Sequence, residues 1–133
     1  MRWQLLCVPS AASAALASVC PGVGPGCRVG AGDQNVTSFQ LYPENAEWDP
    51  KRCRMYFSAV YNSTVVVWDP VRRLQTGLLS IPGLSYQPPG HASGVRLDDS
   101  GDNLFIMNNA GAAFSTDGAD IAGDNNLVNT SST

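Results

Sequence analysis

The chain has 133 residues, of which 44% are hydrophobic and 14% are charged, a balance typical of one globular domain rather than of a disordered chain. Its 13 glycines and 9 prolines favour turns and short strands over long helices, so we expect an all-β fold. The net charge is −3 and the basic residues are scattered along the chain, so nucleic acid is not expected as a partner.

Residues 1–17 have the pattern of a secretory signal peptide. Met1-Arg2 is followed by an apolar run from Trp3 to Val19, and Ala15-Leu16-Ala17 fits the small-x-small rule for cleavage. We expect cleavage after Ala17 and a secreted, extracellular protein. Pro9 argues against a spanning helix, and no second apolar run of that length occurs, so a membrane anchor is not expected.

Three sequons agree with an extracellular location. Asn35, Asn62 and Asn129 each begin a triplet that fits the acceptor rule for N-glycosylation. Asn62 is the favoured site, because it lies at the tip of an expected hairpin where a glycan would meet only water.

The cysteines allow more than one disulfide. Once Cys7 has left with the signal peptide, Cys20, Cys27 and Cys53 remain. Cys20 and Cys27 flank a Gly/Pro loop that could close as a local bridge, and a bond from either of them to Cys53 is an open alternative. No CxxC spacing occurs, which disfavours a zinc site.

A Gly/Pro-rich leader, residues 18–36, precedes the first expected strand, Thr37–Leu41. A short alternating strand follows at Ala46–Trp48, in which Trp48 should pack while Glu47 and Asp49 face solvent. Pro50 then marks a turn.

A β-hairpin is the clearest element of the chain. Arg54–Val60 and Ser63–Asp69 are rich in β-branched and aromatic residues, and Tyr61-Asn62 supplies a tight turn between them. Leu74–Ile81 can form an edge strand, with Gly77 as a bulge, and Pro82–Gly90 is expected to be loop.

The pattern then repeats at an offset of 49 residues. Ala46–Phe57 aligns with Val95–Ile106 without a gap, and the turns expected within the two segments also align. A repeat of about 40 to 50 residues in short strands is the signature of β-propeller blades. We therefore expect a partial propeller of about two antiparallel four-stranded blades, residues 37–90 and 91–133, with a chance likeness between two hairpins of a sandwich as the alternative.

The second expected blade is incomplete. Asn108–Asp124 reads as an acidic loop insertion before a strand at Asn125–Val128. Two blades cannot close a ring, so we expect a truncated chain that associates with itself through exposed blade edges and apolar surface.

Glu44–Pro70 carries a resemblance to a known family. Its segments Glu44–Pro50, Arg54–Ser58 and Val65–Asp69 resemble the first blade of the senescence marker protein/gluconolactonase-like superfamily of six-bladed propellers. The resemblance implies a calcium- or zinc-dependent enzyme in which Glu44 is a metal ligand.

A narrower resemblance covers about residues 35–128. His91–Gly94, Gly101–Ile106 and Asn108–Phe114 are similar to secreted fungal proteins encoded beside trichothecene biosynthesis genes. The later blades that complete the metal site of the wider superfamily are not found in this chain. One carboxylate cannot hold calcium, which takes about six to eight oxygen ligands. No cofactor is therefore expected for this chain, although a complete homologue would bind calcium or zinc.

No other residue pattern indicates catalysis, and the catalytic residues stay unassigned. His91 stands in an expected Pro/Gly loop without an evident partner, and the acidic residues Asp117, Asp120 and Asp124 lack the spacing of a calcium loop. We expect a non-enzymatic secreted protein with a binding or virulence-associated role. The alternative is a metal-dependent hydrolase of a small-molecule lactone or ester that uses Glu44.

Overall fold

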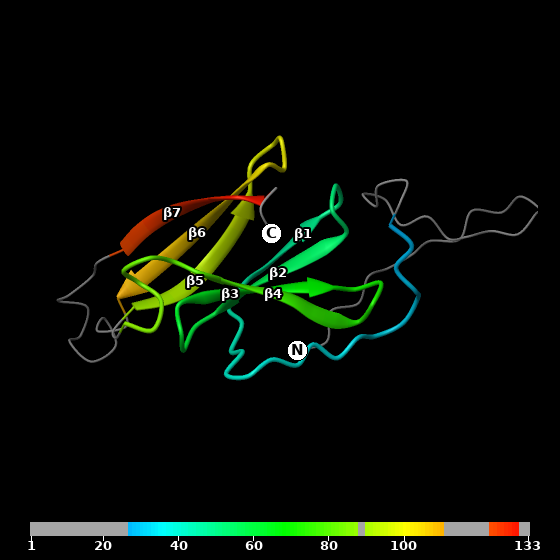
Figure 1. Cartoon of the computed structure of the whole chain (residues 1–133), viewed down its shortest axis with the longest axis horizontal. Coiled ribbons are helices and arrows are strands. Elements are labelled where there is room, and N and C mark those ends of the chain that lie inside the picture. Colours follow the sequence, from blue (N-terminus) through cyan, green and yellow to red (C-terminus); the bar gives the residue numbers. More distant parts are fainter. Residues whose placement is uncertain (1–26, 88–89, 111–122, 131–133) are drawn as a thin grey trace, which may run out of the picture.

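The computed structural model describes residues 27–87, 90–110 and 123–130. Within these ranges, seven strands form two antiparallel sheets (Figure 1), which confirms the all-β class. The first sheet has the order β1-β2-β3-β4, with strands Ala46–Asp49, Arg54–Ala59, Thr64–Asp69 and Leu74–Ser80. The second has the order β5-β6-β7, with strands Gly90–Leu97, Asn103–Ala110 and Gly123–Asn129. No helix in the described ranges is long and apolar enough to cross a membrane.

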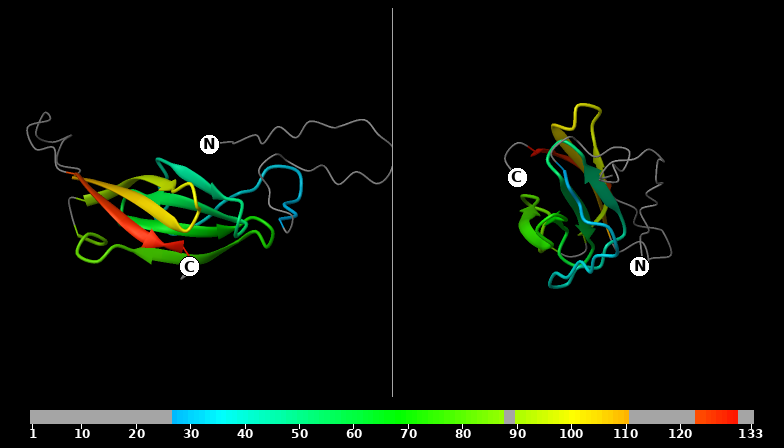
Figure 2. Two further views of the ribbon diagram at one scale, coloured as in Figure 1. Left: turned by 90° about the horizontal axis from the view of Figure 1, so that it is seen from above. Right: turned by 90° about the vertical axis from the view of Figure 1, so that its right-hand side faces the viewer.

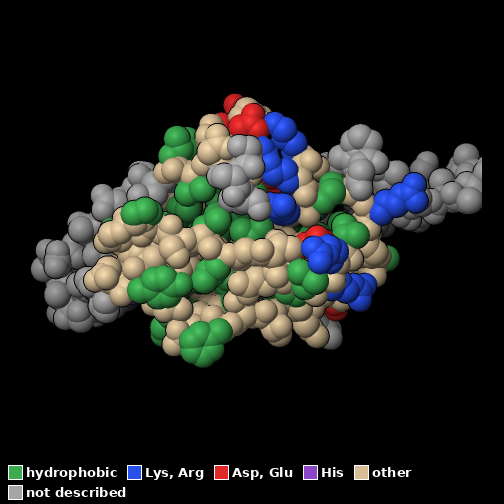
Figure 3. Space-filling model, in the orientation of Figure 1, with side chains coloured by type: hydrophobic (Ala, Val, Ile, Leu, Met, Phe, Trp, Pro, Cys, Tyr) green, Lys and Arg blue, Asp and Glu red, His purple; other side chains and the backbone are tan. Residues whose placement is uncertain are grey.

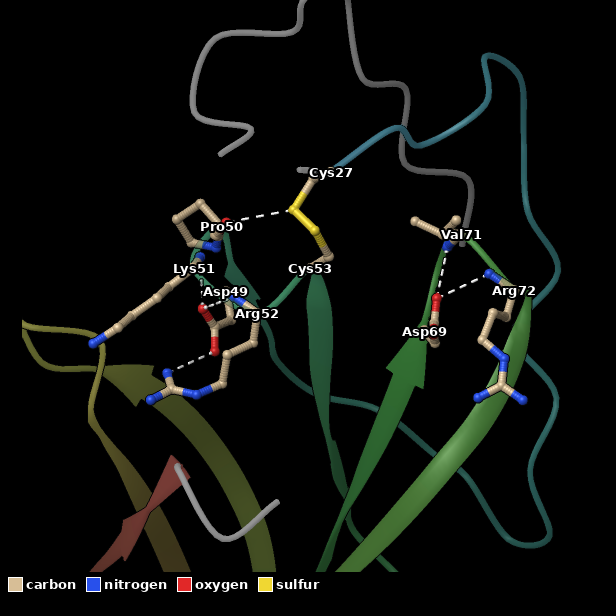
Figure 4. The surroundings of a disulfide bond; sticks show 9 residues. All are labelled: Cys27, Asp49, Pro50, Lys51, Arg52, Cys53, Asp69, Val71 and Arg72. Atoms are coloured by element: carbon tan, nitrogen blue, oxygen red, sulfur yellow. Dashed lines mark hydrogen bonds and ion pairs between the residues drawn. A yellow bond between two sulfur atoms is a disulfide. The ribbon is translucent and has the colours of Figure 1, made fainter. Parts of the chain in front are cut away.

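The turns that join β1 to β2 and β3 to β4 are built from the same short sequence. Trp48-Asp49-Pro50 and Trp68-Asp69-Pro70 each place an aspartate at the end of a strand. The Oδ1 atom of each aspartate accepts hydrogen bonds of 2.9 to 3.0 Å from the backbone N–H groups two and three positions later (Figure 4). The proline fixes φ in the turn and the carboxylate satisfies donors that the turn leaves free, so the tripeptide specifies the reversal twice.

The structure confirms the 49-residue repeat, because the two aligned segments form hairpins with the same strand register. Ala46 pairs with Phe57 across β1 and β2, and Val95 pairs with Ile106 across β5 and β6, at the same offset. Both hairpins therefore present equivalent residues on equivalent faces of their sheets.

We call the side of the first sheet that carries Tyr56, Val65 and Val67 its front face, and the opposite side, with Phe57, Val66 and Trp68, its back face. In the second sheet, the front face is the side whose residues align, at the offset of 49, with front-face residues of the first sheet. The front face of the first sheet packs on the back face of the second, and Figures 1 and 2 show the two twisted sheets lying against each other. The core between them contains eight buried residues: Tyr56, Val65, Val67, Ile81, Ala92, Val95, Leu104 and Ile106.

The back face of the first sheet is covered by an extended segment, residues 27–41, which we call the strap. Val36 and Leu41 of the strap pack against the buried cluster of that face. Trp68 Nε1 donates a hydrogen bond to Gln34 Oε1 at 3.2 Å, and a disulfide joins Cys27 to Cys53. The strap, drawn in blue and cyan in Figure 1, is therefore fixed both by packing and by a covalent bond.

Several expected boundaries were wrong. Thr37–Leu41 is not a strand but part of the strap: Leu41 packs on the back face of the sheet, whereas Phe39 is 86% exposed. The hairpin turn is longer than expected: β2 ends at Ala59 and β3 begins at Thr64.

The second sheet also begins earlier and extends further than expected. β5 starts at Gly90, so His91 lies in a strand opposite Asn109 rather than in a loop. β6 continues to Ala110 and β7 begins at Gly123, so both ends of the expected insertion belong to strands. Its middle, with Asp117 and Asp120, lies outside the described residues, as does the expected signal peptide.

Candidate functional site

The antiparallel strands give the molecule two ends of different chemistry. The turns after β1, β3 and β5 lie at one end, which we call the turn end. The segments 38–45, 60–63 and 81–87 lie at the other, which we call the loop end. Figure 3 shows Lys, Arg, Asp and Glu side chains gathered over the turns of the two hairpins.

The turn end holds a network of ion pairs around Arg52. Its guanidinium donates to Asp49 Oδ2 at 3.2 Å, to Asp102 Oδ1 at 2.8 Å and to the backbone oxygen of Gly101 at 2.6 Å. Lys51 Nζ also reaches Asp102 Oδ1, at 2.5 Å. Because Asp49 belongs to the first sheet and Asp102 to the second, the network joins the two sheets.

Asp49 corrects an expectation from the sequence, because its side chain is fully buried and does not face solvent. Besides Arg52 and the turn N–H groups, it accepts a hydrogen bond of 3.3 Å from the hydroxyl group of Tyr56. The alternation of β1 places Asp49 on the front face, so it lies against the second sheet. A buried carboxylate with this many donors is a structural anchor.

The pKa values at this end follow from these bonds. Burial lowers the pKa of Arg52, but the hydrogen bonds to Asp102 and Asp49 outweigh it and the net shift is upward. Hydrogen bonds from Lys51 and Arg52 lower the pKa of Asp102. The pKa of Asp98 is lowered to about 2, chiefly by the side-chain hydrogen bond from Asn103 at 2.8 Å. All three shifts favour the charged forms that hold the turns.

At the loop end, three loops are hydrogen-bonded to one another through Asn62. Its Nδ2 atom donates to Gln40 Oε1 at 2.9 Å, and its backbone oxygen accepts a hydrogen bond from the N–H of Tyr86 at 2.9 Å. Next to it, the hydroxyl of Ser85 donates to the backbone oxygen of Ser63. The loops thus form one connected surface although they are far apart in sequence.

This surface carries exposed aromatic side chains: Phe39, Tyr42, Tyr61 and Tyr86. Tyr42 and Tyr61 meet edge to face with ring centroids 5.8 Å apart. Isolated exposed apolar residues are ordinary, but a group of them on connected loops indicates an interaction surface.

A hollow of about 420 Å³ opens beside these loops and extends along β4. Its lining contains no charged side chain and consists of Ser38, Phe39, Gln40, Asn62, Thr64, Gln75, Leu78 and Tyr86. The volume lies in the usual range for small-molecule sites, about 300 to 1,000 Å³. Two aromatic rings beside amide and hydroxyl groups suit a neutral ligand that has both apolar and hydroxylated parts.

The backbone at the hollow is strained at two lining residues. Gln40 and Tyr86 have φ angles of 54° and 62°, in the left-handed region that non-glycine residues rarely adopt. Cys53, Ser63 and Arg73 also have positive φ angles, of 54°, 50° and 56°, and do not line the hollow, so this backbone conformation is not particular to the site.

The sequence indicated Glu44 as a metal ligand, and the structure places it at the loop end, exposed to solvent. No group of three or more His, Cys, Asp or Glu side chains in the described part of the chain is arranged to hold a metal ion. Calcium needs about six to eight oxygen ligands and catalytic zinc about three protein ligands, so Glu44 would need more ligands than the described part of the chain groups with it.

Two buried oxygen atoms at the loop end have no hydrogen-bond partner, Ser63 Oγ and Asn108 Oδ1. Gly90 lies between them, because a Cβ atom there would be 3.4 Å from Ser63 Oγ and 3.1 Å from Asn108 Nδ2. Such groups commonly bind an internal water molecule, and a larger residue at position 90 would fill that space.

The other indicated residues have separate places. Asn35 and Asn129 are exposed, whereas Asn62 is partly buried through its bond to Gln40, so a glycan there would lie beside the hollow. All three remain predicted glycosylation sites. The Cys27–Cys53 bond, with Cα atoms 5.5 Å apart, selects one of the open pairings and excludes the local bridge between Cys27 and Cys20, which lies outside the described residues.

Sequence reasoning missed the hollow and the buried Asp49. Aromatic residues in segments rich in Asn, Gln, Gly and Pro were a signal for the hollow, as at Phe39 and Tyr86. The second Trp-Asp-Pro, 20 residues after the first, was a signal that Asp49 has a structural role.

Comparison with known proteins finds two fungal relatives by sequence and one solved structure with a similar fold. No protein-family model matches the chain. It is 36% identical over 106 residues to "Core trichothecene cluster (CTC) protein 14" of Fusarium sporotrichioides, covering 73% of this chain and 28% of the relative. It is also 36% identical over 107 residues to "Trichothecene biosynthesis protein 14" of Trichoderma arundinaceum, covering 74% of this chain and 30% of the relative. The chain therefore spans less than a third of the length of these curated relatives.

The crystal structure of the major Malassezia sympodialis allergen Mala s 1 superposes with a TM-score of 0.60 at 23% identity, over 68% of this chain and 29% of that chain. At this identity the likeness shows the fold alone, which is β-propeller-like. The relatives support the resemblance to trichothecene-associated fungal proteins, and they do not support the wider gluconolactonase-like superfamily.

Proposed function

We propose that the chain is a secreted, non-enzymatic binding protein connected with trichothecene biosynthesis, and that the hollow at the loop end is its ligand site. The hollow is the observation that carries this proposal, because it combines exposed aromatic rings with uncharged hydrogen-bonding groups on loops that are hydrogen-bonded to one another. The names of the two relatives make a trichothecene the first ligand to test.

On this proposal the two sheets are consecutive blades of a propeller-like array. The shared register at an offset of 49 residues and the front-to-back packing support it. Loops at one end of such a scaffold commonly carry binding.

The test is a titration of the purified protein with a trichothecene, followed by intrinsic fluorescence. We expect saturable binding that weakens at least about tenfold when Phe39→Ser and Tyr86→Ser are combined, because truncating aromatic anchors costs more than about 1.4 kcal/mol in a binding site. Tyr61→Ser is the matched control, since Tyr61 is an exposed aromatic residue of the same end that does not line the hollow. Equal weakening in the control, or no binding by the unaltered protein, would refute the proposed site.

The same preparation tests the alternative of a metal-dependent lactonase or esterase. We expect neither calcium nor zinc to produce hydrolysis of a lactone substrate or to raise the melting temperature, because the part of the chain that the structure describes groups no set of His, Cys, Asp or Glu ligands with Glu44. Metal-dependent hydrolysis that is lost in Glu44→Ala would overturn the non-enzymatic proposal.

A further inference from the structure

Asn62 is both a predicted glycosylation site and part of the wall of the hollow. It begins the triplet Asn62-Ser63-Thr64, which fits the acceptor rule for N-glycosylation. Its side chain lines the hollow together with Phe39 and Gln40 of the strap. A sugar joined to Asn62 therefore starts at the hollow itself rather than in open water.

A hydrogen bond shows which way the Asn62 side chain points. Its Nδ2 atom, which is the atom that carries the sugar in an N-linked glycan, donates to Gln40 Oε1 at 2.9 Å, and this bond is exposed to solvent. An amide nitrogen has two hydrogens, so a sugar can replace one of them while the other remains for Gln40. The bond thus directs the first sugar toward the part of the strap that holds Phe39.

Phe39 offers the apolar surface that suits a sugar ring. It is 86% exposed although it lines the hollow. A sugar ring has a face of C–H groups, which can pack on an aromatic ring, and polar groups around its edge. Ser38, Gln40 and Gln75 place uncharged hydrogen-bonding groups around the hollow for that edge. N-acetylglucosamine, the sugar that begins an N-linked glycan, matches both kinds of group.

The buried end of the acceptor triplet indicates when the sugar is added. Thr64 is 1% exposed and pairs with Ala59 and Ser80 in the sheet, so an enzyme can read the triplet only before the sheet forms. The donor is an oligosaccharide joined to a lipid pyrophosphate. Nδ2 of Asn62 bonds to the anomeric carbon and loses one proton, while the bond from that carbon to the phosphate oxygen breaks and the lipid pyrophosphate leaves with the electron pair. The sugar is then already in place when the strap closes beside it.

We propose that the first sugar of a glycan on Asn62 packs against Phe39 at the mouth of the hollow, and that this sugar closes the hollow to other ligands. The packing follows from the direction of Nδ2 and from the exposed ring, whatever else the hollow binds. The closing of the site rests on the proposed function, because it presupposes a ligand that binds there. Both parts rest on the proposed secretion, and chains without this sugar keep the hollow open.

A full chain in which Asn62 is the remaining sequon tests the packing. It carries Asn35→Gln and Asn129→Gln, is made in yeast, and is trimmed by an endoglycosidase to a single sugar; the same chain from bacteria, with its disulfide formed, carries none. We expect the single sugar to raise the melting temperature by about 2 to 4 °C because it covers Phe39, and to have no such effect in Phe39→Ser. Tyr61→Ser is the matched control and should keep the rise, since Tyr61 is an exposed aromatic residue next to Asn62 that does not line the hollow.

Nuclear Overhauser effects between the sugar protons and the ring protons of Phe39 give a second measurement that needs no variant at position 39. Their absence, a rise that persists in Phe39→Ser, or a rise that is lost in Tyr61→Ser would overturn packing against Phe39. A secreted chain without a sugar on Asn62 would refute this proposal alone. A chain that stays in the yeast with residues 1–17 attached would refute the proposed secretion and this proposal with it.

Titration of both forms with a trichothecene tests the closing of the hollow. We expect the form with the single sugar to bind at least about tenfold more weakly than the form without it, because the sugar occupies part of the site. Equal affinities would overturn the closing of the hollow and leave the proposed function intact. Failure of both forms to bind would refute the proposed function, and with it the closing, but not the packing of the sugar on Phe39.

Discussion

Asp49 and Asp69 occupy the same position in the same tripeptide, yet their surroundings differ. Asp49 is buried against the second sheet and pairs with Arg52, whereas the hydrogen bonds of Asp69 are exposed to solvent. The sequence predicted the turn at Pro50 but not this difference, because burial of Asp49 depends on a sheet that begins 41 residues later, at Gly90.

The two aspartates make a matched pair of substitutions. We expect Asp49→Ala to lower the free energy of unfolding by about 3 kcal/mol, because it removes a buried carboxylate that accepts hydrogen bonds from Arg52, from the Tyr56 hydroxyl and from two turn N–H groups. Asp69→Ala should cost about 1 kcal/mol, since water can replace the lost acceptor. Urea unfolding of both variants measures the difference, and equal costs would contradict the anchoring role of Asp49.

The lowered pKa of Asp98 predicts how the stability of the protein falls at acidic pH. Its pKa falls from 3.8 to about 2 on folding, so the stability it contributes is present above about pH 4 and is lost as the pH falls through about 2. The Asp98→Asn variant should show a smaller decrease of melting temperature between these values, and Asp99→Asn serves as a control of equal charge. The variant should keep part of the slope, because Asp102 also has a lowered pKa in the folded state. If the melting temperature of Asp98→Asn fell with pH as steeply as that of the unaltered protein, the hydrogen bonds to the Asp98 carboxylate would not stabilise the fold.

At the scale of elements, the strap is the feature that sequence reasoning could not find. Thr37–Leu41 alternates like a strand, and nothing local shows that Val36 and Leu41 cover a sheet face instead of joining it. The expected hairpin and its edge strand were found because their residues alternate or are β-branched, and the register change between Val67 and Trp68 lies opposite the expected bulge at Gly77.

The disulfide should stabilise the strap mainly by restricting the unfolded chain. It closes a loop with a sequence separation of 26 residues, for which the loss of chain entropy in the unfolded state corresponds to about 3.5 kcal/mol. We expect the double variant Cys27→Ser and Cys53→Ser to unfold at correspondingly lower urea concentration and to be cleaved by proteases within residues 28–41 before the sheets are attacked. Cleavage first within β2 or β3 would show that the strap does not detach separately.

At the scale of the whole molecule, the two sheets share one core and should unfold together. The tryptophans of the described residues, Trp48 and Trp68, lie in the first sheet, whereas Ile106 lies in the second. We expect Ile106→Ala to cost about 3 kcal/mol and to shift the tryptophan fluorescence transition and the circular dichroism transition equally, at a fixed protein concentration. Separate transitions would show that the sheets are independent units.

The sequence also predicted that β1 and β2 pair in the same register as β5 and β6, because the two segments align without a gap. It could not predict which faces meet, since the two faces of β2 and β3 are almost equally apolar and the choice depends on the strap and on the second sheet.

The separation of the turn end from the loop end has a consequence for how such a chain can change. The described ion pairs between the sheets, and the aspartates that set the turns, lie at the turn end, whereas the hollow is lined mainly by residues of the loop end, with Leu78 and Gln75 of β4 beyond them. Substitutions and insertions in residues 38–42 and 60–62 therefore leave the junction of the sheets intact. New recognition properties can arise at one end by exchange of short segments, while the other end preserves the architecture on which they are displayed.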